Sequence, residues 1–359
     1  MDLSRLGWCD DWEAALAQLP ERNVLPARVV SAQRERYRVY MVHGVANAVL
    51  SGRLRHASGP GELPVVGDWV AVQADGADHA RIDAVLPRRT SLARRHADRA
   101  SGLQLIAANI DRVFVMSSLN RDFNPRRLER ALAMVLEGGA EPVIVLSKLD
   151  LCPEPAVYLD QLRAIAPATP VHAVSVLHGL HLEPLRDYLQ GHRSVAVIGS
   201  SGVGKSTLLN WLCPDAAVET AQVREWDERG RHTTTSRELH VLATGGVVID
   251  TPGMREFGLA DHAQGVDTVF DDIATLAARC RFSDCQHRGE PGCAIGAALE
   301  AGELAAERVN AHRKLQRELA YEARRRDEAG QQAYQRELRR VMRQRTRAQR
   351  TRHRDRDRG

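Results

Sequence analysis

The segment Gly199–Thr207 (GSSGVGKST) constrains the fold of this chain more than any other. It fits the pattern G-x-x-x-x-G-K-[ST], follows an apolar run at 194–198 and opens a helical pattern at Leu208. A strand, a glycine-rich turn and a helix in this order form a P-loop, whose backbone N–H groups cradle phosphates. The predicted phosphate-binding residues are Gly199, Ser200, Ser201, Gly202, Val203, Gly204, Lys205, Ser206 and Thr207.

Two of these side chains have separate expected roles. Lys205 reaches the β- and γ-phosphates, and the hydroxyl of Ser206 is a ligand for Mg²⁺. Downstream, the apolar strand at 247–249 ends in Asp250, whose carboxylate can hold Mg²⁺ through water, and Gly253 can sense the γ-phosphate. The segment between the P-loop and Asp250 offers hydroxyls for the metal, and we assign Thr234 as the ligand.

The sequence around the P-loop alternates apolar strands with helical stretches, which indicates a parallel sheet with crossover helices. One such helix is predicted at 125–137, with Leu128, Leu132 and Val135 on one face. Buried strands are predicted at 112–116, 142–146, 170–174, 194–198 and 246–249. We therefore expect a doubly wound α/β domain.

A candidate base-selecting motif precedes the P-loop instead of following it. Ser147, Lys148 and Asp150 come just after a buried strand, and Ser175 follows the next strand. An Asp there can accept two hydrogen bonds from guanine, the Lys stem can lie over the ring, and Ser175 stands where a second guanine contact is expected. Nucleotide-binding domains of this type usually have the opposite order, so the pattern predicts a circularly permuted P-loop GTPase domain.

A Cys/His cluster follows the predicted α/β domain. Three thiols and one imidazole lie within 14 residues, at Cys280, Cys285, His287 and Cys293. They make a complete tetrahedral ligand set with no position left for water, so we expect one structural Zn²⁺.

The region at 24–90 contains about five short β segments separated by Gly, Pro and Asp turns. This spacing predicts a small β-barrel of the OB type. The stretch that follows is rich in arginine, and it is either a linker or a loop that contacts phosphates; its members are Arg88, Arg89, Arg94, Arg95 and Arg99.

Charge is unevenly distributed along the 359 residues. The net charge is +4, yet the segment from Arg313 to Gly359 has 17 Lys or Arg and 7 Asp or Glu, so it carries +10 and the remainder −6. A cationic tail indicates a polyanionic partner, and nucleic acid is a better candidate than a membrane surface. The alternative is that the tail is a solvated chain end without a partner. With no secretory signal and no apolar run of about 18 residues, we expect a cytoplasmic protein that does not enter a membrane. No feature of the sequence demands a dimer, so we expect a monomer.

These motifs, in this order, resemble the ribosome small-subunit-dependent GTPase A family. The resemblance runs from about Val24 to beyond Leu319, and it is carried by Gly67–Val70, Gly199–Thr207, Gly230–Thr235, Asp250–Gly253, Cys280–His287 and Glu290–Cys293. It implies an N-terminal OB-type barrel, a permuted GTPase domain and a C-terminal helical zinc-binding domain. It also implies GTP hydrolysis stimulated by the small (30S) ribosomal subunit late in its maturation, with the subunit, its rRNA and GTP or GDP as partners.

The expected divisions are an N-terminal extension over 1–23, the OB-fold nucleic-acid-binding domain over 24–95, the permuted GTPase domain over 96–275, the zinc-binding domain over 276–323 and a basic tail over 324–359.

Two positions depart from common GTPase patterns. Ser147 stands where the family often has Asn, and since a hydroxyl cannot reproduce both amide contacts we expect weaker guanine affinity. Met254 stands where a Ras-type enzyme has the Gln that orients water. The resemblance therefore implies His232 as the catalytic residue, beside Lys205. Two alternatives stay open: an rRNA-binding assembly protein that does not use nucleotide, and a P-loop enzyme that uses ATP.

Overall fold

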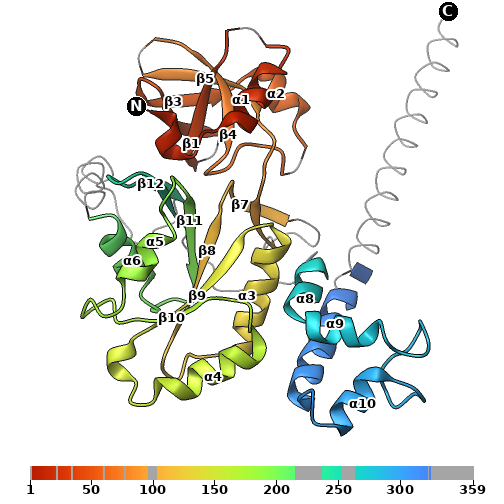
Figure 1. The fold of residues 1–359 in the computed structure, drawn as a ribbon. Coiled ribbons are helices and arrows are strands. Elements are labelled where there is room, and N and C mark those ends of the chain that lie inside the picture. Colours follow the sequence, from red (N-terminus) through yellow and green to blue (C-terminus); the bar gives the residue numbers. More distant parts are fainter. Residues whose placement is uncertain are drawn as a thin grey trace, which may run out of the picture.

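The structure is a computed structural model of the chain. It describes residues 2–95 except 22, 34, 60 and 77, then 103–214, 237–251 and 263–324 except 322. A β-barrel, an α/β sheet and a helical unit follow one another along the chain (Figure 1). Among the described residues, no helix has the length and apolar character needed to cross a membrane.

The N-terminal barrel has five strands. β1 pairs with both β2 and β4, and β3 pairs with β5, so the order β1-β2-β3-β5-β4 closes on itself. A short helix, α2 (Gly52–Ala57), connects β3 to β4. The strands are β1 (Leu25–Gln33), β2 (Arg36–Met41), β3 (Gly44–Leu50), β4 (Trp69–Ala74) and β5 (His79–Val85). The predicted OB-type barrel is confirmed.

The first residues of the chain pack against the barrel. They form the 3-10 helix η1 (Leu3–Leu6) and the helix α1 (Asp10–Ala17). The rings of Trp8 and Trp12 lie 4.7 and 5.8 Å from the ring of Trp69, and Trp69 is fully buried. The segment before the barrel therefore contributes to the core.

Two arginines of the Arg-rich stretch form ion pairs with acidic residues of the same chain. Arg88 donates two hydrogen bonds, of 2.7 and 2.8 Å, to the carboxylate of the buried Asp68. Arg89 pairs with Asp11 and lies over the ring of Trp12. Neither alternative, a linker or a phosphate-contacting loop, describes these two side chains. The stretch continues into β6 (Ser91–Arg95), which pairs with β7 (Leu103–Ala108) across the expected boundary at residue 95.

The α/β domain has a six-stranded sheet of order β10-β9-β8-β11-β13-β12. Neighbouring strands are parallel except β12, which is antiparallel to β13. The strands are β8 (Arg112–Ser118), β9 (Glu141–Ser147), β10 (Val171–Ala173), β11 (Ser194–Gly199), β12 (Glu238–Val241) and β13 (Val247–Asp250). The P-loop strand β11 lies centrally although it is fourth along the chain, which is the arrangement that the permutation predicts.

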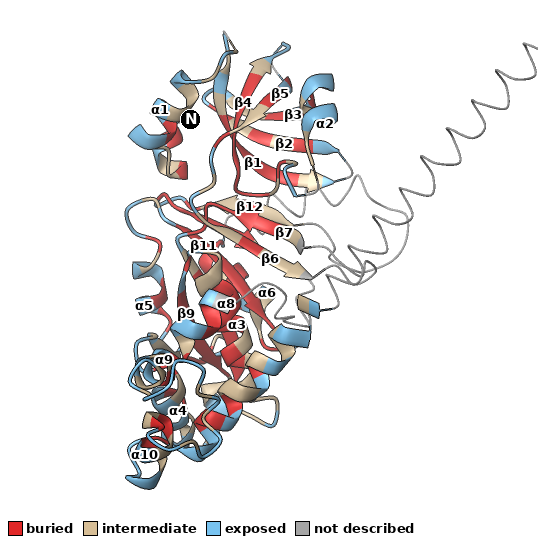
Figure 2. Ribbon diagram, turned by 90° about the vertical axis from the view of Figure 1, so that its right-hand side faces the viewer, coloured by how far each residue is buried: buried red, intermediate tan, exposed pale blue. Residues whose placement is uncertain are grey.

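Helices cover both faces of this sheet, as a doubly wound domain requires (Figures 1 and 2). Successive side chains of a strand point to opposite faces, so Val113 and Val115 pack on one side and Phe114 and Met116 on the other. The first face contacts α3 (Pro125–Glu137) and α4 (Pro155–Ile165), and the second contacts α5 (Glu183–Asp187) and α6 (Lys205–Leu212). The helix predicted at 125–137 is confirmed.

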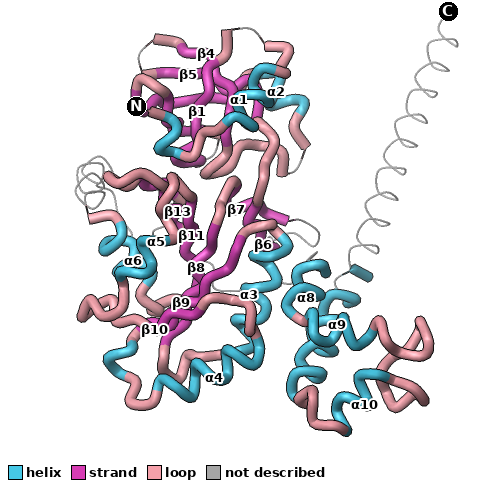
Figure 3. The backbone as a smooth tube through the Cα atoms, viewed as in Figure 1, coloured by secondary structure: helices cyan, strands magenta, loops and turns pink. Residues whose placement is uncertain are grey.

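Barrel and sheet are joined edge to edge. β1 pairs with β12 at Ser31 and Glu238, and Arg38 forms an ion pair with Glu238 at 3.3 Å. Figure 3 shows the barrel strands above the α/β strands. Because β12 is also paired with β13, the barrel is connected through β12 to the strand that ends at Asp250.

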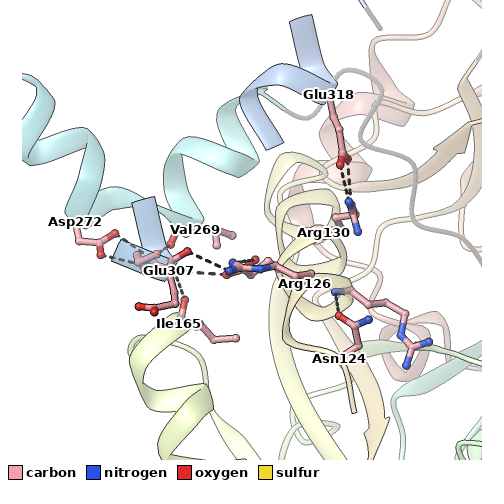
Figure 4. Close-up of polar contacts among 11 residues, drawn as sticks. Asn124, Arg126, Arg130, Ile165, Val269, Asp272, Glu307 and Glu318 are labelled. Carbon is pink, nitrogen blue, oxygen red and sulfur yellow. Dashed lines mark hydrogen bonds and ion pairs between the residues drawn. The ribbon is translucent and has the colours of Figure 1, made fainter. Parts of the chain in front are cut away.

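The helical unit packs against α3. It contains α8 (Ala263–Val269), α9 (Asp271–Ala277), α10 (Ala294–Glu300) and a helix over 306–321. Gly265 of α8 lies so close to Ala133 of α3 that a Cβ would stand 1.9 Å from its carbonyl oxygen. Arg126 donates to the carbonyl of Glu307, and Arg130 pairs with Glu318 at 2.7 Å (Figure 4). These contacts fix the helical unit on the α/β domain.

Candidate nucleotide-binding site

The predicted motifs meet at one edge of the α/β sheet. Strand register places the end of β9 at Ser147 beside Ser118 of β8, and the end of β11 at Gly199 beside Met116. β13 ends at Asp250, which pairs with Val197 of β11. Ligands bind outside the carboxyl ends of the strands in open parallel sheets, so this edge is the candidate site.

The P-loop has the predicted strand, turn and helix. Gly199 has φ 152°, and a Cβ there would lie 2.6 Å from the carbonyl oxygen of Met116, so only glycine fits. Gly204 has φ 98° and precedes α6. The Nζ of Lys205 donates to the carbonyls of Gly199 (2.9 Å) and Ser200 (2.6 Å), which holds the ammonium at the mouth of the loop. Ser206 and Thr207 are exposed on the first turn of α6.

Ser147 contacts the P-loop. Its hydroxyl, buried at the end of β9, donates to the carbonyl of Val203 at 2.6 Å and lies 3.3 Å from the carbonyl of Ser117. Val203 is itself buried inside the loop. The first residue of the predicted base-selecting motif is therefore tied to the phosphate-binding loop.

Asp150 and Ser175 come together as the sequence predicts. The Ser175 hydroxyl donates to Oδ1 of Asp150 at 2.5 Å, and Nε2 of His178 lies 3.8 Å from Oδ2. This hydrogen bond from Ser175 holds the pKa of Asp150 below its usual value. Lys148, just before, has the left-handed φ of 62°. The carboxylate of Asp150 is thus ionised and can accept hydrogen bonds from the N–H groups of a nucleobase.

Asp250 lies at the end of β13 on the P-loop side. Burial raises the pKa of its carboxyl, while the nearby charges of His240 and Lys205 act in the opposite direction. The next residue, Thr251, is fully buried and donates to the carbonyl of Val197 at 2.6 Å. A half-buried carboxylate close to the P-loop lysine suits a hard cation such as Mg²⁺, which prefers oxygen ligands.

The predictions for His232, Thr234 and Gly253 lie outside the described residues.

Sequence reasoning missed Asp122, in the loop between β8 and α3. Its Oδ2 accepts a hydrogen bond from the Ser200 hydroxyl at 2.6 Å. The only sequence signal was its position shortly after a buried strand that lies beside the P-loop strand.

The Cys/His cluster is assembled in the helical unit. The ligand atoms of Cys280, Cys285, His287 and Cys293 all lie within 4.8 Å of one another. Nδ1 of His287 is 3.5 Å from Sγ of Cys280 and 3.6 Å from Sγ of Cys293. A tetrahedral Zn²⁺ with ordinary bond lengths separates sulfur and nitrogen by about 3.6 Å. The donor set therefore fits a metal ion such as zinc.

Comparison with known proteins agrees with this geometry. A family described as RsgA GTPase matches residues 85–260. The small ribosomal subunit biogenesis GTPase RsgA of Syntrophotalea carbinolica is 39% identical over 352 residues, which are 96% of this chain and 97% of that protein. The chain belongs to the RsgA GTPase family. The RsgA 2 protein of Lactiplantibacillus plantarum is 43% identical over 303 residues, covering 84% of this chain and 85% of its own.

Solved structures also resemble this RsgA family member. The crystal structure of YjeQ from Thermotoga maritima has a TM-score of 0.63 and 27% identity, covering 83% of this chain and 99% of that one. YloQ, described as a circularly permuted GTPase, shares the fold with a TM-score of 0.58 and 24% identity, covering 86% and 97%. The predicted permuted fold is confirmed, and membership of the RsgA family makes the chain a GTP-hydrolysing enzyme.

Proposed function

We propose that this chain hydrolyses GTP on the small (30S) ribosomal subunit during late maturation, and that the subunit stimulates hydrolysis. Its relatives from two bacteria are named small ribosomal subunit biogenesis GTPases. The observation that carries the proposal is the convergence of Lys205, Asp150 and Asp250 on one edge of the sheet, because they suit phosphate, guanine and metal respectively.

The P-loop over residues 199–207 would bind the GTP phosphates, with Lys205 supplying positive charge. Ser206 and Asp250 would hold Mg²⁺, together with Thr234. Their oxygens are the ligand type that Mg²⁺ takes in phosphate sites. When bound, the metal neutralises charge that develops on the phosphate oxygens.

Asp150 would select guanine. Its carboxylate accepts the two guanine N–H groups, the stem of Lys148 covers the ring, and Ser175 holds Asp150 in place through the 2.5 Å hydrogen bond. Ser147 would act indirectly, because its hydroxyl is directed at the Val203 carbonyl of the P-loop. The Ser147 hydroxyl would thus hold the P-loop in place, but it would bind guanine more weakly than the amide of an asparagine.

His232 would orient the attacking water, a role that Met254 cannot fill. Lys205 would stabilise the charge that forms on the transferring phosphate. Gly253, between Asp250 and Met254, would sense the γ-phosphate.

The Cys/His cluster would bind one structural Zn²⁺ through all four ligands, and the helical unit would dock on the subunit. The basic tail from residue 324 and the barrel would contact rRNA, since a charge of +10 after residue 312 favours phosphate-rich partners. We also propose the five divisions given above, a monomer, and a cytoplasmic location without membrane contact.

Competition between nucleotides tests the proposal against the ATP-using and nucleotide-independent alternatives. Fluorescently labelled GDP is bound to the full-length protein with Mg²⁺ and then displaced by GTP or ATP. The proposal predicts displacement by GTP at concentrations at least about 100-fold lower than by ATP, since a site built to pair with the base leaves unpaired groups with the wrong one. Equal displacement would favour an ATP-using enzyme, and no binding of labelled GDP would favour a nucleotide-independent protein.

A further inference from the structure

The loop between β8 and α3 contacts the P-loop through a charged side chain, that of Asp122. Asp122 accepts a hydrogen bond at Oδ2 from the Ser200 hydroxyl (2.6 Å) and forms an ion pair at Oδ1 with Arg127 of α3 (2.9 Å). The carbonyl of the same Ser200 accepts from Lys205 at 2.6 Å. Lys205 therefore holds the carbonyl of Ser200, and Asp122 holds its hydroxyl.

The loop that carries Asp122 is internally fixed. The side-chain oxygen of Asn120 accepts from the Asp122 backbone N–H at 2.9 Å and from the Ser118 hydroxyl at 2.8 Å. The Leu119 N–H donates to the carbonyl of Ser147 at 2.9 Å. Asp122 thus has a defined position between the end of β9 and the P-loop.

Arg127, the other partner of Asp122, belongs to a helix that is held on its far side. Arg126 and Arg130 of α3 bind the helix over 306–321, and Asn124 caps the first turn of α3 (Figure 4). The close contact of Gly265 with Ala133 fixes α3 further along. Asp122 therefore joins the P-loop to a rigid element.

The charge of Asp122 suits this contact. Burial acts to raise the pKa of the carboxyl, but hydrogen bonds from Ser200 and Arg127, with the charge of Lys148, outweigh it and hold the pKa below its usual value. The group is a carboxylate at neutral pH. Hydrogen bonds to a charged acceptor are stronger than those between neutral groups, so the Ser200 hydroxyl is firmly oriented.

We propose that Asp122 is a positioning residue that fixes Ser200, and with it the first turn of the P-loop, in the conformation that binds nucleotide phosphates. A loop that is already ordered loses less conformational entropy when its ligand binds. Without Asp122 the Ser200 hydroxyl loses its acceptor, and part of the binding free energy is spent on ordering the loop. The inference rests on the proposed phosphate-binding role of the P-loop.

A double-mutant cycle on labelled GDP affinity tests the inference in the full-length protein. Asp122→Ala and Ser200→Ala are each expected to raise Kd about tenfold, the effect of one charge-assisted hydrogen bond. The double variant should also have a Kd about tenfold higher than the intact chain, because both changes remove the same contact. Asp122→Asn keeps an acceptor for the Ser200 hydroxyl, so its Kd should lie between those of the intact chain and Asp122→Ala. In turnover with small subunits, these variants should raise KM more than they lower kcat.

Two further variants make the outcome decisive. Asp160→Ala removes an exposed ion pair with Arg163 on α4 and should leave Kd unchanged. Lys205→Ala should abolish tight binding; if it binds GDP like the intact chain, the proposed role of the P-loop fails. If Lys205→Ala loses binding while Ser200→Ala keeps full affinity, or the two single losses simply add, Asp122 serves only to anchor α3 and the inference is overturned. Urea unfolding of each variant establishes that the measured protein is folded.

Discussion

Arg28 of β1 is a buried cation at the junction of barrel and α/β sheet, and its removal gives a quantitative test of that junction. The side chain is 1% exposed. It donates to the carbonyls of Asn109 (2.9 Å), Gly67 (3.2 Å) and Leu6, and to the hydroxyl of Ser194 (2.8 Å). Burial lowers its pKa to about 10, which still leaves it charged at neutral pH.

The expected cost of Arg28→Met follows from these partners. Methionine preserves most of the apolar stem but donates no hydrogen bond. The carbonyl of Gly67 keeps a donor, the side chain of Asn109 at 3.2 Å, whereas the carbonyls of Leu6 and Asn109 lose theirs. Each buried acceptor left unsatisfied costs about 1–3 kcal/mol, and relief from burying a charge offsets part of the total. We expect the unfolding free energy to fall by about 3 kcal/mol.

Urea unfolding followed by tryptophan fluorescence measures this change, because the cluster of Trp8, Trp12 and Trp69 lies beside Arg28. Arg38→Met is the matched control: its side chain is 39% exposed and pairs with Glu238, so its loss should cost less than about 1 kcal/mol. If Arg28→Met costs no more than this control, the hydrogen bonds of Arg28 do not stabilise the junction and the reasoning is refuted.

Four further predictions concern the nucleotide site and the Cys/His cluster. Asp150→Asn should reduce the preference for GTP over ATP at least tenfold in nucleotide displacement, because an amide cannot accept both guanine hydrogen bonds; an unchanged preference would remove Asp150 from base selection. In the intact chain the preference for GTP over ATP should stay constant between about pH 5 and 8. The pKa of Asp150 is lowered, so its carboxylate stays ionised over this range, and GTP affinity is lost only when the pH falls through that pKa. His232→Ala should lower subunit-stimulated turnover by roughly 10² with little change in GTP affinity, and full turnover in this variant would assign water orientation to another group. Cys285→Ser should release zinc and loosen the helical unit while GDP affinity persists, with Cys152→Ser, a cysteine outside the cluster, as control; retained zinc, measured by metal analysis, would contradict the four-ligand site.

The sheet was predictable from sequence where single strands carry continuous apolar runs. β8, β9, β11 and β13 are such runs, because both faces of the sheet are covered by helices. β12 was not predicted: its sequence, Glu238–Val241, is half polar, and its strand conformation depends on pairing with β13 and β1. β1 is far from β12 along the chain, so this second pairing leaves no local signal.

The same distinction applies to the site. The P-loop and the Cys/His cluster were predictable because each combines residue types whose spacing is set by the ligand, and Asp150 and Ser175 were expected near each other because they follow successive strands. The role of Asp122 was not, since a short polar turn has many possible partners and Ser200 is 78 residues away. Arg88 was misjudged for a similar reason: only the fold shows that the buried Asp68 neutralises it.

We propose that the small ribosomal subunit stimulates GTP hydrolysis at this P-loop. The most direct test measures phosphate release from GTP by the intact chain and by Lys205→Ala, each with and without purified 30S subunits at fixed salt. The account predicts slow turnover by the intact chain alone, stimulation of at least about tenfold by subunits, and no stimulated turnover in Lys205→Ala. Turnover by the intact chain that is the same with and without subunits, or stimulation that survives in Lys205→Ala, would contradict it.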